Sequence, residues 1–513
     1  MSAAAPERRV VVVGAGWAGL STAWSLSQEA NVAVTVVDAA PRPGGVVRDG
    51  FKTTLGKAAE AGQHGFWDEY HNIYELLYDE LALTGAADPL TGYAEQGQYS
   101  PKGLEAVWPV YRDQPTLPTG LGQALFTRFD NLSPLELATA APLVAAFSEF
   151  DGSPEAWRRF DKLSFRDLCT KLGVGRRLYD EAFEPMILTG LFAPGEQCSA
   201  AAALGMAYFF VLKNQNAFDV RWCRGNIGDK IFAPWCDRLR ASGADLRFDT
   251  KVAGLEVDGG ATVSAVCLDD GSVLECDDVV FAVGMRALKG LSRSPSLSGF
   301  DEFRAFGNLR GTDVLATRLF LDGPVETPYS ANACWGFDDK VGMTWFDITK
   351  LHGLPQGEGT VVEVDFYHAG SLLGLDDAAI VDRAKSYLDK MVPGFKSRSV
   401  LDAAVVKLPE AVNWFYPGSY ASCPTTTSAS LKNAFFAGDV VRDLGHGSWS
   451  QEKAYVSGKI AANAILGRDL LHGVTPLEPD EAHVALGRTA VRTLRSALSF
   501  GGGEGPSLAA VPW

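Results

Sequence analysis

The sequence predicts an α/β fold built on a Rossmann-type, mostly parallel sheet. The first indication is an apolar run at 10–13 that leads into the turn Gly14-Ala15-Gly16-Trp17-Ala18-Gly19 and then into a helical stretch. The second is an apolar strand at 34–37 that ends in Asp38, 24 positions after Gly14 (38 − 14). This strand–turn–helix–strand unit is typical of proteins that hold the ADP half of a dinucleotide. We therefore expect a dinucleotide-binding domain at the start of the chain.

Each glycine of this first segment meets a physical requirement of the turn. Gly14 permits the tight turn out of the strand, Gly16 lets backbone approach a pyrophosphate because it has no Cβ, and Gly19 lets the helix pack closely on the sheet. The positive N-terminus of that helix faces the phosphates, and the acid accepts hydrogen bonds from the ribose. The predicted cofactor-binding residues here are Gly14, Gly16, Trp17, Ala18, Gly19 and Asp38.

Two further segments indicate that the dinucleotide is FAD. An arginine precedes a glycine pair whose backbone can lie against a second phosphate or a ribityl chain, which a nicotinamide site does not require. Near the C-terminus, 434–439 is predicted to be a buried strand that ends in a Gly-Asp turn, and 452–462 a helix whose N–H groups can reach the pyrimidine end of a flavin. The predicted residues are Arg42, Gly44, Gly45, Gly438, Asp439, Glu452 and Ala454.

Together these segments resemble the flavin-containing amine oxidoreductases, and the middle of the chain resembles their carotenoid desaturase branch (phytoene, zeta-carotene and ring desaturases). The resemblance covers residues 8 to 468 and is most specific at its two ends. It implies an amine-oxidase-like fold, FAD as cofactor, and hydride transfer from a long isoprenoid. The segments that carry it are 60–67, 163–168, 183–186, 224–228, 243–248, 416–420 and 436–439.

One segment departs from the family pattern. After the Gly-Asp turn the chain reads His446-Gly447-Ser448-Trp449-Ser450-Gln451-Glu452-Lys453-Ala454, with Lys453 where the family usually has glycine. This stretch resembles zeta-carotene or ring desaturases more than phytoene desaturases. The identity of the substrate is therefore left open here.

The predicted domains are discontinuous. The FAD-binding domain takes residues 1–105, 223–289 and 405–470, and the substrate domain takes a helical part at 106–222 and a strand-rich part at 290–404. Residues 471–513 are expected to form an amphipathic helix and a flexible tail that contains the glycines at 501–505. The family pattern implies that Val252 presents its backbone to the adenine.

Composition excludes several other classes of protein. The chain has 513 residues, 47% of them hydrophobic, which is enough for a large core and more than one domain. A net charge of −16 argues against a nucleic-acid partner. The eight cysteines show no C-x-x-C pattern and lie mostly in apolar runs, so we expect reduced core residues of an intracellular protein, cytoplasmic or plastid, and no metal site. The sequence has no run of 18 apolar residues, and from the short polar segment at 1–9 we expect no signal peptide.

Hydride loss next to a polyene needs no strong base, because the conjugated chain can spread the developing positive charge. His64 and His446 are the candidate catalytic residues, for proton exchange or for orientation, since each lies in a motif near the predicted flavin. Glu60 can bind a ribose, orient His64 or pair with an arginine. The aromatic residues Trp414, Phe415, Tyr416, Trp449 and Tyr455 suit an amine oxidase equally well.

Several functional alternatives stay open. Besides carotenoid desaturation, these are flavin-dependent carotenoid isomerisation, amine oxidation or protoporphyrinogen oxidation with peroxide as product, and pigment binding without turnover. Quinone or oxygen is the expected electron acceptor. Apolar residues at 135–147 can line a substrate tunnel, touch a bilayer or form an ordinary buried helix. Val484 and Val491 share one helical stripe while Arg488 and Arg492 share another, so this helix can lie on a membrane surface or dock on the protein.

Overall fold

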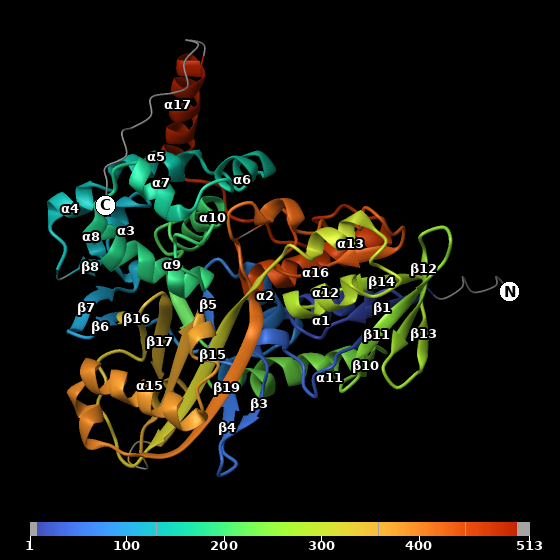
Figure 1. The fold of residues 1–513 in the computed structure, drawn as a ribbon, viewed down its shortest axis with the longest axis horizontal. Coiled ribbons are helices and arrows are strands. Elements are labelled where there is room, and N and C mark those ends of the chain that lie inside the picture. The colour runs from blue at the N-terminus through green and yellow to red at the C-terminus, as the bar shows by residue number, and fades with distance from the viewer. Residues whose placement is uncertain (1–7, 130, 356, 358, 447, 500–513) are drawn as a thin grey trace.

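The computed structural model describes residues 8–129, 131–355, 357, 359–446 and 448–499. Its first organising element is a five-stranded parallel sheet with strand order β10-β2-β1-β14-β20, which confirms the predicted fold class. Figure 1 shows this sheet at one end of the molecule and a second sheet at the other. The strands of the parallel sheet are β1 (Arg8–Val13), β2 (Val32–Val37), β10 (Asp245–Arg247), β14 (Asp278–Phe281) and β20 (Ala434–Phe436).

Both faces of the parallel sheet are covered, which explains why β1 is a run of valines. Val10 and Val12 belong to a core shared with helices α1 (Trp17–Ser27), α11 (Ala233–Ala241) and α16 (Gln451–Leu466). Val11 and Val13 belong to the opposite core. Successive side chains of a strand point to opposite faces, so a strand buried on both sides is apolar throughout.

The opposite core is closed by a small antiparallel sheet and two helices. The sheet contains the strands expected after residue 251, and the helices follow β14. These elements are β11 (Val252–Val257), β12 (Val263–Leu268), β13 (Val273–Glu275), α12 (Met285–Ser292) and α13 (Asp301–Phe306).

The second large sheet has eight strands in mixed order, β19-β15-β18-β17-β16-β6-β7-β8. It contains the strands predicted near 314–321, 342–346 and 359–367, and α15 (Asp377–Met391) packs on it. The strands are β6 (Gln96–Ser100), β7 (Gly103–Trp108), β8 (Arg128–Phe129), β15 (Gly311–Leu321), β16 (Ala331–Asp338), β17 (Val341–Asp347), β18 (Val361–Tyr367) and β19 (Val400–Asn413).

Two predicted domain boundaries fall inside strands of this sheet. The boundary at 105 cuts β7, and the boundary at 404 cuts β19. A boundary belongs where few contacts cross it, so we move the first to a point before β6 and the second to a point after β19. The cause of the difference is long-range: β6 joins the sheet by pairing with β16, more than 200 residues away. The division into domains otherwise stays a prediction.

The region 106–222 is mostly helical, as expected, and has its own core. The apolar stretch at 135–147 is divided between α4 and α5, with Pro142 in the first turn of α5. Leu135 and Val144 are 80% and 58% exposed, so the interpretation as an ordinary buried helix is wrong for them. The helices are α3 (Leu121–Phe126), α4 (Pro134–Ala138), α5 (Ala141–Glu149), α6 (Pro154–Phe160), α7 (Phe165–Lys171), α8 (Arg176–Leu178), α9 (Glu184–Leu191) and α10 (Ala200–Phe210).

The C-terminal helix α17 (Ala482–Ser499) docks on α5, at the end of the molecule far from the parallel sheet (Figure 1). Arg488 donates to the Ser148 carbonyl, with 3.1 Å between Nε and O, and its Nη1 lies 2.7 Å from Asp480 Oδ2. Arg492 pairs with Asp151 at 2.6 Å. Two of the arginines that suggested a membrane-facing stripe therefore bind the protein itself. The side chains from 494 onward and the glycines at 501–505 lie outside the described residues.

No helix in the described ranges is long and apolar enough to cross a membrane. All eight cysteines are free, and seven of them are buried. Among the described residues no cluster of histidine, cysteine and acidic side chains has the arrangement of a metal site.

Candidate functional site

The two glycine segments, predicted from opposite ends of the chain, lie against each other. Trp17, the first residue of α1, donates from Nε1 to Gln451 Oε1, the first residue of α16, at 2.9 Å. Further along the same two helices, the Ser21 hydroxyl donates to the Tyr455 carbonyl at 2.7 Å. Gly458 makes this close packing possible, since a Cβ on it would lie 2.3 Å from the Ala18 carbonyl oxygen.

The glycines leave backbone uncovered where a dinucleotide would lie. Gly14 has φ +112°, and a Cβ on it would lie 2.2 Å from the Ala282 carbonyl oxygen, so the turn at the end of β1 requires glycine. Gly16 faces the Gly44–Gly45 pair, and its nearest neighbour would be Gly45 Cα at 3.6 Å. Beside Gly438 (φ +139°) a Cβ would meet only one side-chain atom, at 4.0 Å. The faces of Gly16 and Gly438, which no side chain crowds, fit the pyrophosphate and ribityl parts of FAD.

Asp38 lies at the end of β2, where the acid of the motif is expected. Its carboxylate accepts from the backbone N–H of Ala15 at 2.7 Å and of Ala40 at 2.8 Å. Burial raises the pKa of this carboxyl, and the two N–H groups oppose that shift. The Asp38 carbonyl also accepts from Thr250 N at 2.8 Å, which brings the start of β11 with Val252 near this end of the sheet. Ribose and adenine binding by these two residues stays a prediction.

The guanidinium of Arg42 has protein partners. Its Nε and Nη2 donate to the two carboxylate oxygens of Asp49 at 2.6 and 2.8 Å, and Nη2 also donates to Asp229 at 2.8 Å. The bidentate pair fixes Arg42 to the strand after the glycine pair, β3 (Asp49–Lys52), and the bond to Asp229 joins Arg42 to the segment at 228–232. The contact accounts for Arg42 without a cofactor, and its predicted role in binding FAD remains to be tested.

Asp439, three residues after the end of β20, lies among polar and aromatic partners. Its Oδ1 accepts from Asn413 Nδ2 at 2.7 Å, and the Trp449 side chain is a further hydrogen-bond partner. Burial raises the pKa of Asp439 to about 6, while the nearby Lys453 ammonium and the two donors oppose the shift. The neighbouring Gly438 N–H donates to Ser457 Oγ at 2.7 Å, which holds the turn on α16.

The first turn of α16 contains the remaining predicted residues. Ala454 is half-buried there, and Glu452 is fully buried. The Glu452 carboxylate accepts from the backbone N–H groups of Asn72 at 2.9 Å and Ile73 at 3.0 Å, and so binds the N-terminus of α2 (His71–Glu75). The side chain is thus explained by helix capping, and direct contact with the flavin by Glu452 remains a prediction.

The two candidate histidines have different surroundings. His446 is buried, with its Nε2 3.5 Å from Glu452 Oε1, so it belongs to the same group as the α2 N-terminus. Burial lowers the pKa of His64 to about 4, so its imidazole is neutral at pH 7 and accepts protons weakly. Among the described residues its Nδ1 has no hydrogen-bond partner. Neither catalytic assignment is tested by this geometry.

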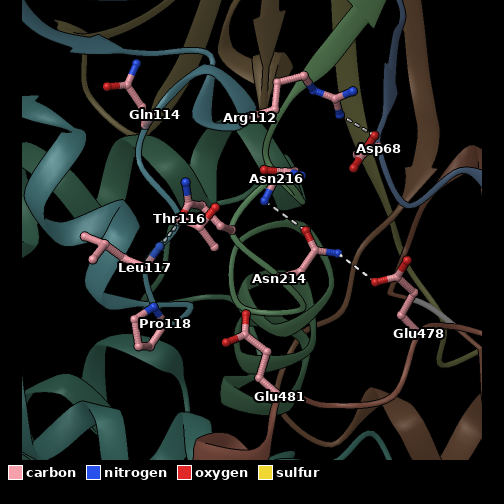
Figure 2. Close-up of a pocket in the computed structure, with 11 residues that line it drawn as sticks. Asp68, Arg112, Gln114, Thr116, Leu117, Pro118, Asn214, Asn216, Glu478 and Glu481 are labelled. Atoms are coloured by element: carbon pink, nitrogen blue, oxygen red, sulfur yellow. Dashed lines mark hydrogen bonds and ion pairs between the residues drawn. The ribbon is translucent and has the colours of Figure 1, made fainter.

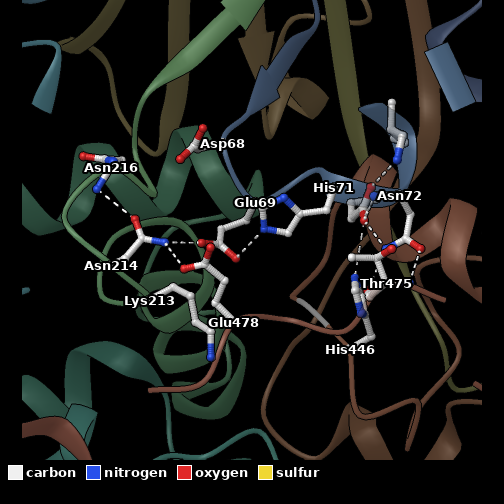
Figure 3. Close-up of polar contacts among 12 residues, drawn as sticks. Asp68, Glu69, His71, Asn72, Lys213, Asn214, Asn216, His446, Thr475 and Glu478 are labelled. Carbon is white, nitrogen blue, oxygen red and sulfur yellow. Dashed lines mark hydrogen bonds and ion pairs between the residues drawn. The ribbon is translucent and has the colours of Figure 1, made fainter. Parts of the chain in front are cut away.

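The polar contacts around Glu452 and the start of α2 continue toward the surface of the protein, as Figure 3 shows. His71 Nε2 lies 3.6 Å from Glu69 Oε2, and Asn214 Nδ2 donates to Glu69 Oε1 at 2.5 Å. Asn214 also reaches Glu478 at 3.4 Å. Polar contacts therefore connect α2, the end of the helical region and the C-terminal segment.

Beyond Glu478 lies a surface cavity of about 470 Å³, shown in Figure 2. Its lining is mostly polar, with three carboxylates and with Arg112 paired to Asp68, and it includes none of the predicted cofactor residues. The lining residues are Asp68, Arg112, Gln114, Thr116, Leu117, Pro118, Asn214, Gln215, Asn216, Glu478 and Glu481.

A buried charge cluster lies where the segment after the first glycine motif meets the eight-stranded sheet. Arg318 on β15 pairs with Glu363 on β18, and its Nη2 lies 3.4 Å from Glu60 Oε1, which confirms the alternative that Glu60 pairs with an arginine. Asp365 accepts from the Gln63 N–H at 3.2 Å. Burial raises the pKa of Glu60 to about 7 and also raises those of Glu363 and Asp365. One arginine faces three buried carboxyls, so the shortage of positive charge acts with burial to raise the pKa values of these carboxyls.

The sequence interpretation missed Arg318, Glu363 and Asp365. The available signal was the presence of charged residues inside apolar strands, since Arg318 interrupts 314–321 and the two acids interrupt 361–367. Residues 363 and 365 share one face of the strand because side chains alternate. What the sequence did not show is the pairing of Arg318 directly opposite Glu363.

An aromatic cluster leads from the Gly-Asp turn into the second sheet. Trp449, beside Asp439, contacts Phe192 with ring centroids 4.9 Å apart, and Phe192 stacks on Tyr367 of β18 at 4.1 Å. Of the five aromatic residues weighed from the sequence, Trp449 therefore contacts the predicted flavin site. Tyr455 packs with Trp17 and Trp235 in the core of the parallel sheet, and Phe415 belongs to the helical core.

Comparison with known proteins identifies the family of this chain. The sequence pattern of the family described as "Flavin containing amine oxidoreductase" matches residues 17–466. The chain is 24% identical to 15-cis-phytoene desaturase of Arabidopsis thaliana, over 93% of this chain and 83% of the relative. It is 23% identical to a probable zeta-carotene desaturase of Synechococcus elongatus, over 89% of this chain and 98% of the relative. These relatives support the carotenoid desaturase branch.

Solved structures share the fold. Cyclohexylamine oxidase from Brevibacterium oxydans has a TM-score of 0.66 at 16% identity, over 90% of this chain and 99% of that one. Putrescine oxidase bound to putrescine has a TM-score of 0.64 at 18% identity, over 90% of this chain and 99% of that one. With the glycine segments joined as described, the cofactor is FAD. The chain belongs to the flavin-containing amine oxidoreductase family, as an FAD-dependent oxidoreductase.

Proposed function

We propose that this protein desaturates a long hydrophobic isoprenoid of the carotenoid type. The observation that carries the proposal is the similarity to phytoene and zeta-carotene desaturases along about nine-tenths of the chain. The geometry agrees with it, because the side chains that lead away from Asp439 are the uncharged rings of Trp449, Phe192 and Tyr367. A hydrocarbon chain loses no hydrogen bonds against such a surface.

When bound, FAD supplies a hydride acceptor at its N5 atom. The chain's own residues would hold and orient this cofactor. Gly16 and Gly45 present backbone to the pyrophosphate, and Asp439 presents a carboxylate to the ribityl chain. The aromatic cluster excludes water from the reacting carbon. The proton lost from the neighbouring carbon needs only a modest acceptor, because a polyene spreads the positive charge.

Buried carboxyl groups are suitable acceptors for that proton. Glu363 Oε1 and Asp365 Oδ1 have no hydrogen-bond partner among the described residues, and both side chains are buried. His64 suits the role less well, since its low pKa makes it a weak acceptor at pH 7. We assign the proton to the Glu60–Arg318–Glu363–Asp365 cluster, and assign His64 to the positioning of its loop.

The test is expression in a pigment-producing host, followed by chromatography of the carotenoids. We expect new double bonds in an acyclic carotenoid with the intact chain and none with Gly16→Val, which should not retain FAD. A pigment that changes only in geometry would indicate flavin-dependent isomerisation. An unchanged profile with every substrate, together with peroxide formation from amines, would refute the proposal in favour of an amine oxidase.

The electron acceptor, quinone or oxygen, is part of the same proposal. Anaerobic turnover that depends on added quinone is expected, since the substrate and quinones share an apolar phase. Turnover that requires oxygen and releases peroxide would assign oxygen instead. The compartment, cytoplasm or plastid, is likewise proposed from the relatives, of which the Arabidopsis protein is chloroplastic or chromoplastic.

We also propose peripheral contact with a membrane, through the helical region at 106–222 together with α17, which docks on α5 of that region (Figure 1). These helices expose large apolar side chains: Leu121 at 48%, Leu125 at 63%, Leu135 at 80%, Val144 at 58% and Leu486 at 71%. In a vesicle flotation assay, Leu125→Glu with Leu135→Glu should lose lipid binding. Leu401→Glu, a matched control at a 62% exposed leucine on β19, should keep it.

Truncation before Asp480 separates the role of α17 from that of the other helices. Lipid binding that survives this truncation would remove α17 from the proposal. Binding that survives the double glutamate variant would refute the contact surface as a whole.

A further inference from the structure

Arg48 is a half-buried arginine beside the glycine pair of the cofactor site. It follows the short helix η1 (Gly45–Val47), and its guanidinium folds back so that Nη1 donates to the Gly45 carbonyl at 3.2 Å. The backbone of Arg48 is packed just as closely, because a Cβ on Gly44 would lie 2.9 Å from its Cα. Arg48 therefore holds its charge next to the backbone that faces Gly16.

Among the described residues, no carboxylate forms an ion pair with Arg48. Its guanidinium has the Gly45 carbonyl as acceptor and lies over the Phe51 ring, with Cζ 5.1 Å from the ring centroid. The acid that its charge affects is Asp38: burial raises the pKa of that carboxyl, and two backbone N–H groups and the charge of Arg48 lower it. A half-buried cation without a counter-ion has lost hydration that only an anion restores in energy, so we expect an anionic ligand here.

Arg42 differs from Arg48 in exactly this respect. The two arginines stand on either side of the glycine pair in the sequence, and Arg42 is the one predicted to bind the cofactor. Its guanidinium, however, is engaged with the carboxylates of Asp49 and Asp229. The positive charge that remains available beside the glycine pair is therefore that of Arg48.

The N-terminus of α1 adjoins the same backbone. Gly16 is the N-cap of this helix, and in the described part of the chain no side chain caps it and no acidic residue lies in its first turn. The Gly44 N–H donates to the Ala15 carbonyl at 2.8 Å, which joins the glycine pair to this turn. Free N–H groups at a helix N-terminus attract phosphate, and Arg48 adds a full positive charge to their partial one.

We propose that Arg48 binds the pyrophosphate of FAD, as the counter-charge to phosphate groups that lie at the N-terminus of α1. The glycine segments leave room for the pyrophosphate beside Gly16 and Gly45, and Arg48 is bonded to the carbonyl of the second of these. A guanidinium is suited to this place, because it has several donors and can bind phosphate oxygens while one Nη still donates to the Gly45 carbonyl. The inference concerns the cofactor and does not depend on the substrate proposed above.

The test is the dissociation constant of FAD, obtained by serial dilution of purified holoprotein and measurement of the fluorescence of the released FAD. Arg48→Gln keeps a donor for the Gly45 carbonyl and removes the charge. We expect it to bind FAD about 10- to 100-fold more weakly than the wild type, which is the loss of one charge-assisted hydrogen bond. Arg48→Lys keeps the charge and should bind FAD more tightly than Arg48→Gln does.

Arg240→Met is the matched control, because it removes the same charge from an arginine of α11 that pairs with Asp237 at 3.1 Å. It should bind FAD as the wild type does. If Arg48→Gln does not fold, Arg48→Met keeps the aliphatic stem over Phe51 and should show the same loss. Wild-type affinity in the Arg48→Gln variant, an Arg48→Lys variant as weak as Arg48→Gln, or an equal loss in Arg240→Met would overturn the proposal.

Discussion

Gly458→Ala tests the contact that joins the two ends of the chain. A Cβ at this position would lie 2.3 Å from the Ala18 carbonyl oxygen and 2.7 Å from Ser21 Cβ, far inside the 3.4 Å of ordinary contact. Helices α1 and α16 must therefore move apart by about 1 Å, the difference between 3.4 and 2.3 Å, and overpacking is known to force backbone shifts of this kind. The hydrogen bonds from Ser21 and Thr22 to α16 would stretch with them.

The magnitude follows from three terms. Overpacking costs about 1–3 kcal/mol, and two weakened hydrogen bonds cost about 1 kcal/mol each. Alanine returns about 1 kcal/mol through its better helix propensity. We expect the free energy of unfolding to fall by about 2–4 kcal/mol, with loss of flavin because Trp17 and Gln451 separate.

The assay is urea unfolding together with the flavin content of purified protein. Gly290→Ala is the matched control, because Gly290 also lies in a helix and a Cβ there would meet nothing within 4 Å. It should be neutral or stabilising by up to about 1 kcal/mol. A Gly458→Ala protein with wild-type stability and full flavin content would refute the reasoning that close helix packing builds the site.

Gly16→Val should fold but purify without flavin. Because a Cβ at this position would be in ordinary contact with its neighbours, the free energy of unfolding of the apoprotein should stay within about 1 kcal/mol of the wild type. A variant that retains flavin would contradict this prediction. Arg318→Met should lower stability by about 3–5 kcal/mol in urea unfolding at pH 8, since it leaves buried carboxyls without a counter-ion, and a smaller loss than Lys407→Met on the neighbouring strand would refute this. Glu60 binds a proton in the folded chain up to about pH 7 but only up to about pH 4.5 in the unfolded chain, so the free energy of unfolding should fall by about 3 kcal/mol as the pH rises across that window. Glu60→Gln should make this fall smaller, and an unchanged slope would contradict the argument that burial raises the pKa of Glu60. His64→Asn should leave the pH profile of turnover between pH 5 and 8 unchanged, because the pKa of His64 is about 4; a displaced profile would restore His64 as the acid–base group.

Local rules predicted the first glycine segment well. A run of valines, three spaced glycines and an acid depend only on backbone geometry and the period of a strand, and β1, α1 and β2 lie where expected. The C-terminal strand and helix are similar, since Gly438 and Gly458 occupy places that only glycine fits. Both segments could be read without knowledge of their neighbours.

Contacts between distant strands could not be read in this way. Arg318 gave no indication that it lies opposite Glu363, and Gln96–Ser100 gave none that it pairs with β16. The same holds for the hydrogen-bond partners of Arg42 and Glu452. Arg42 binds Asp49 and Asp229, and Glu452 binds the start of α2. Such partners are set by the register of a sheet and by helix packing, which arise from the whole chain.

The most direct measurement is anaerobic mixing of the purified protein with vesicles that contain an acyclic carotene. We expect the flavin absorbance to bleach and one new double bond to appear for each flavin reduced. A protein that carries no flavin, or a flavin that stays oxidised with every carotene but bleaches with an amine, would contradict it.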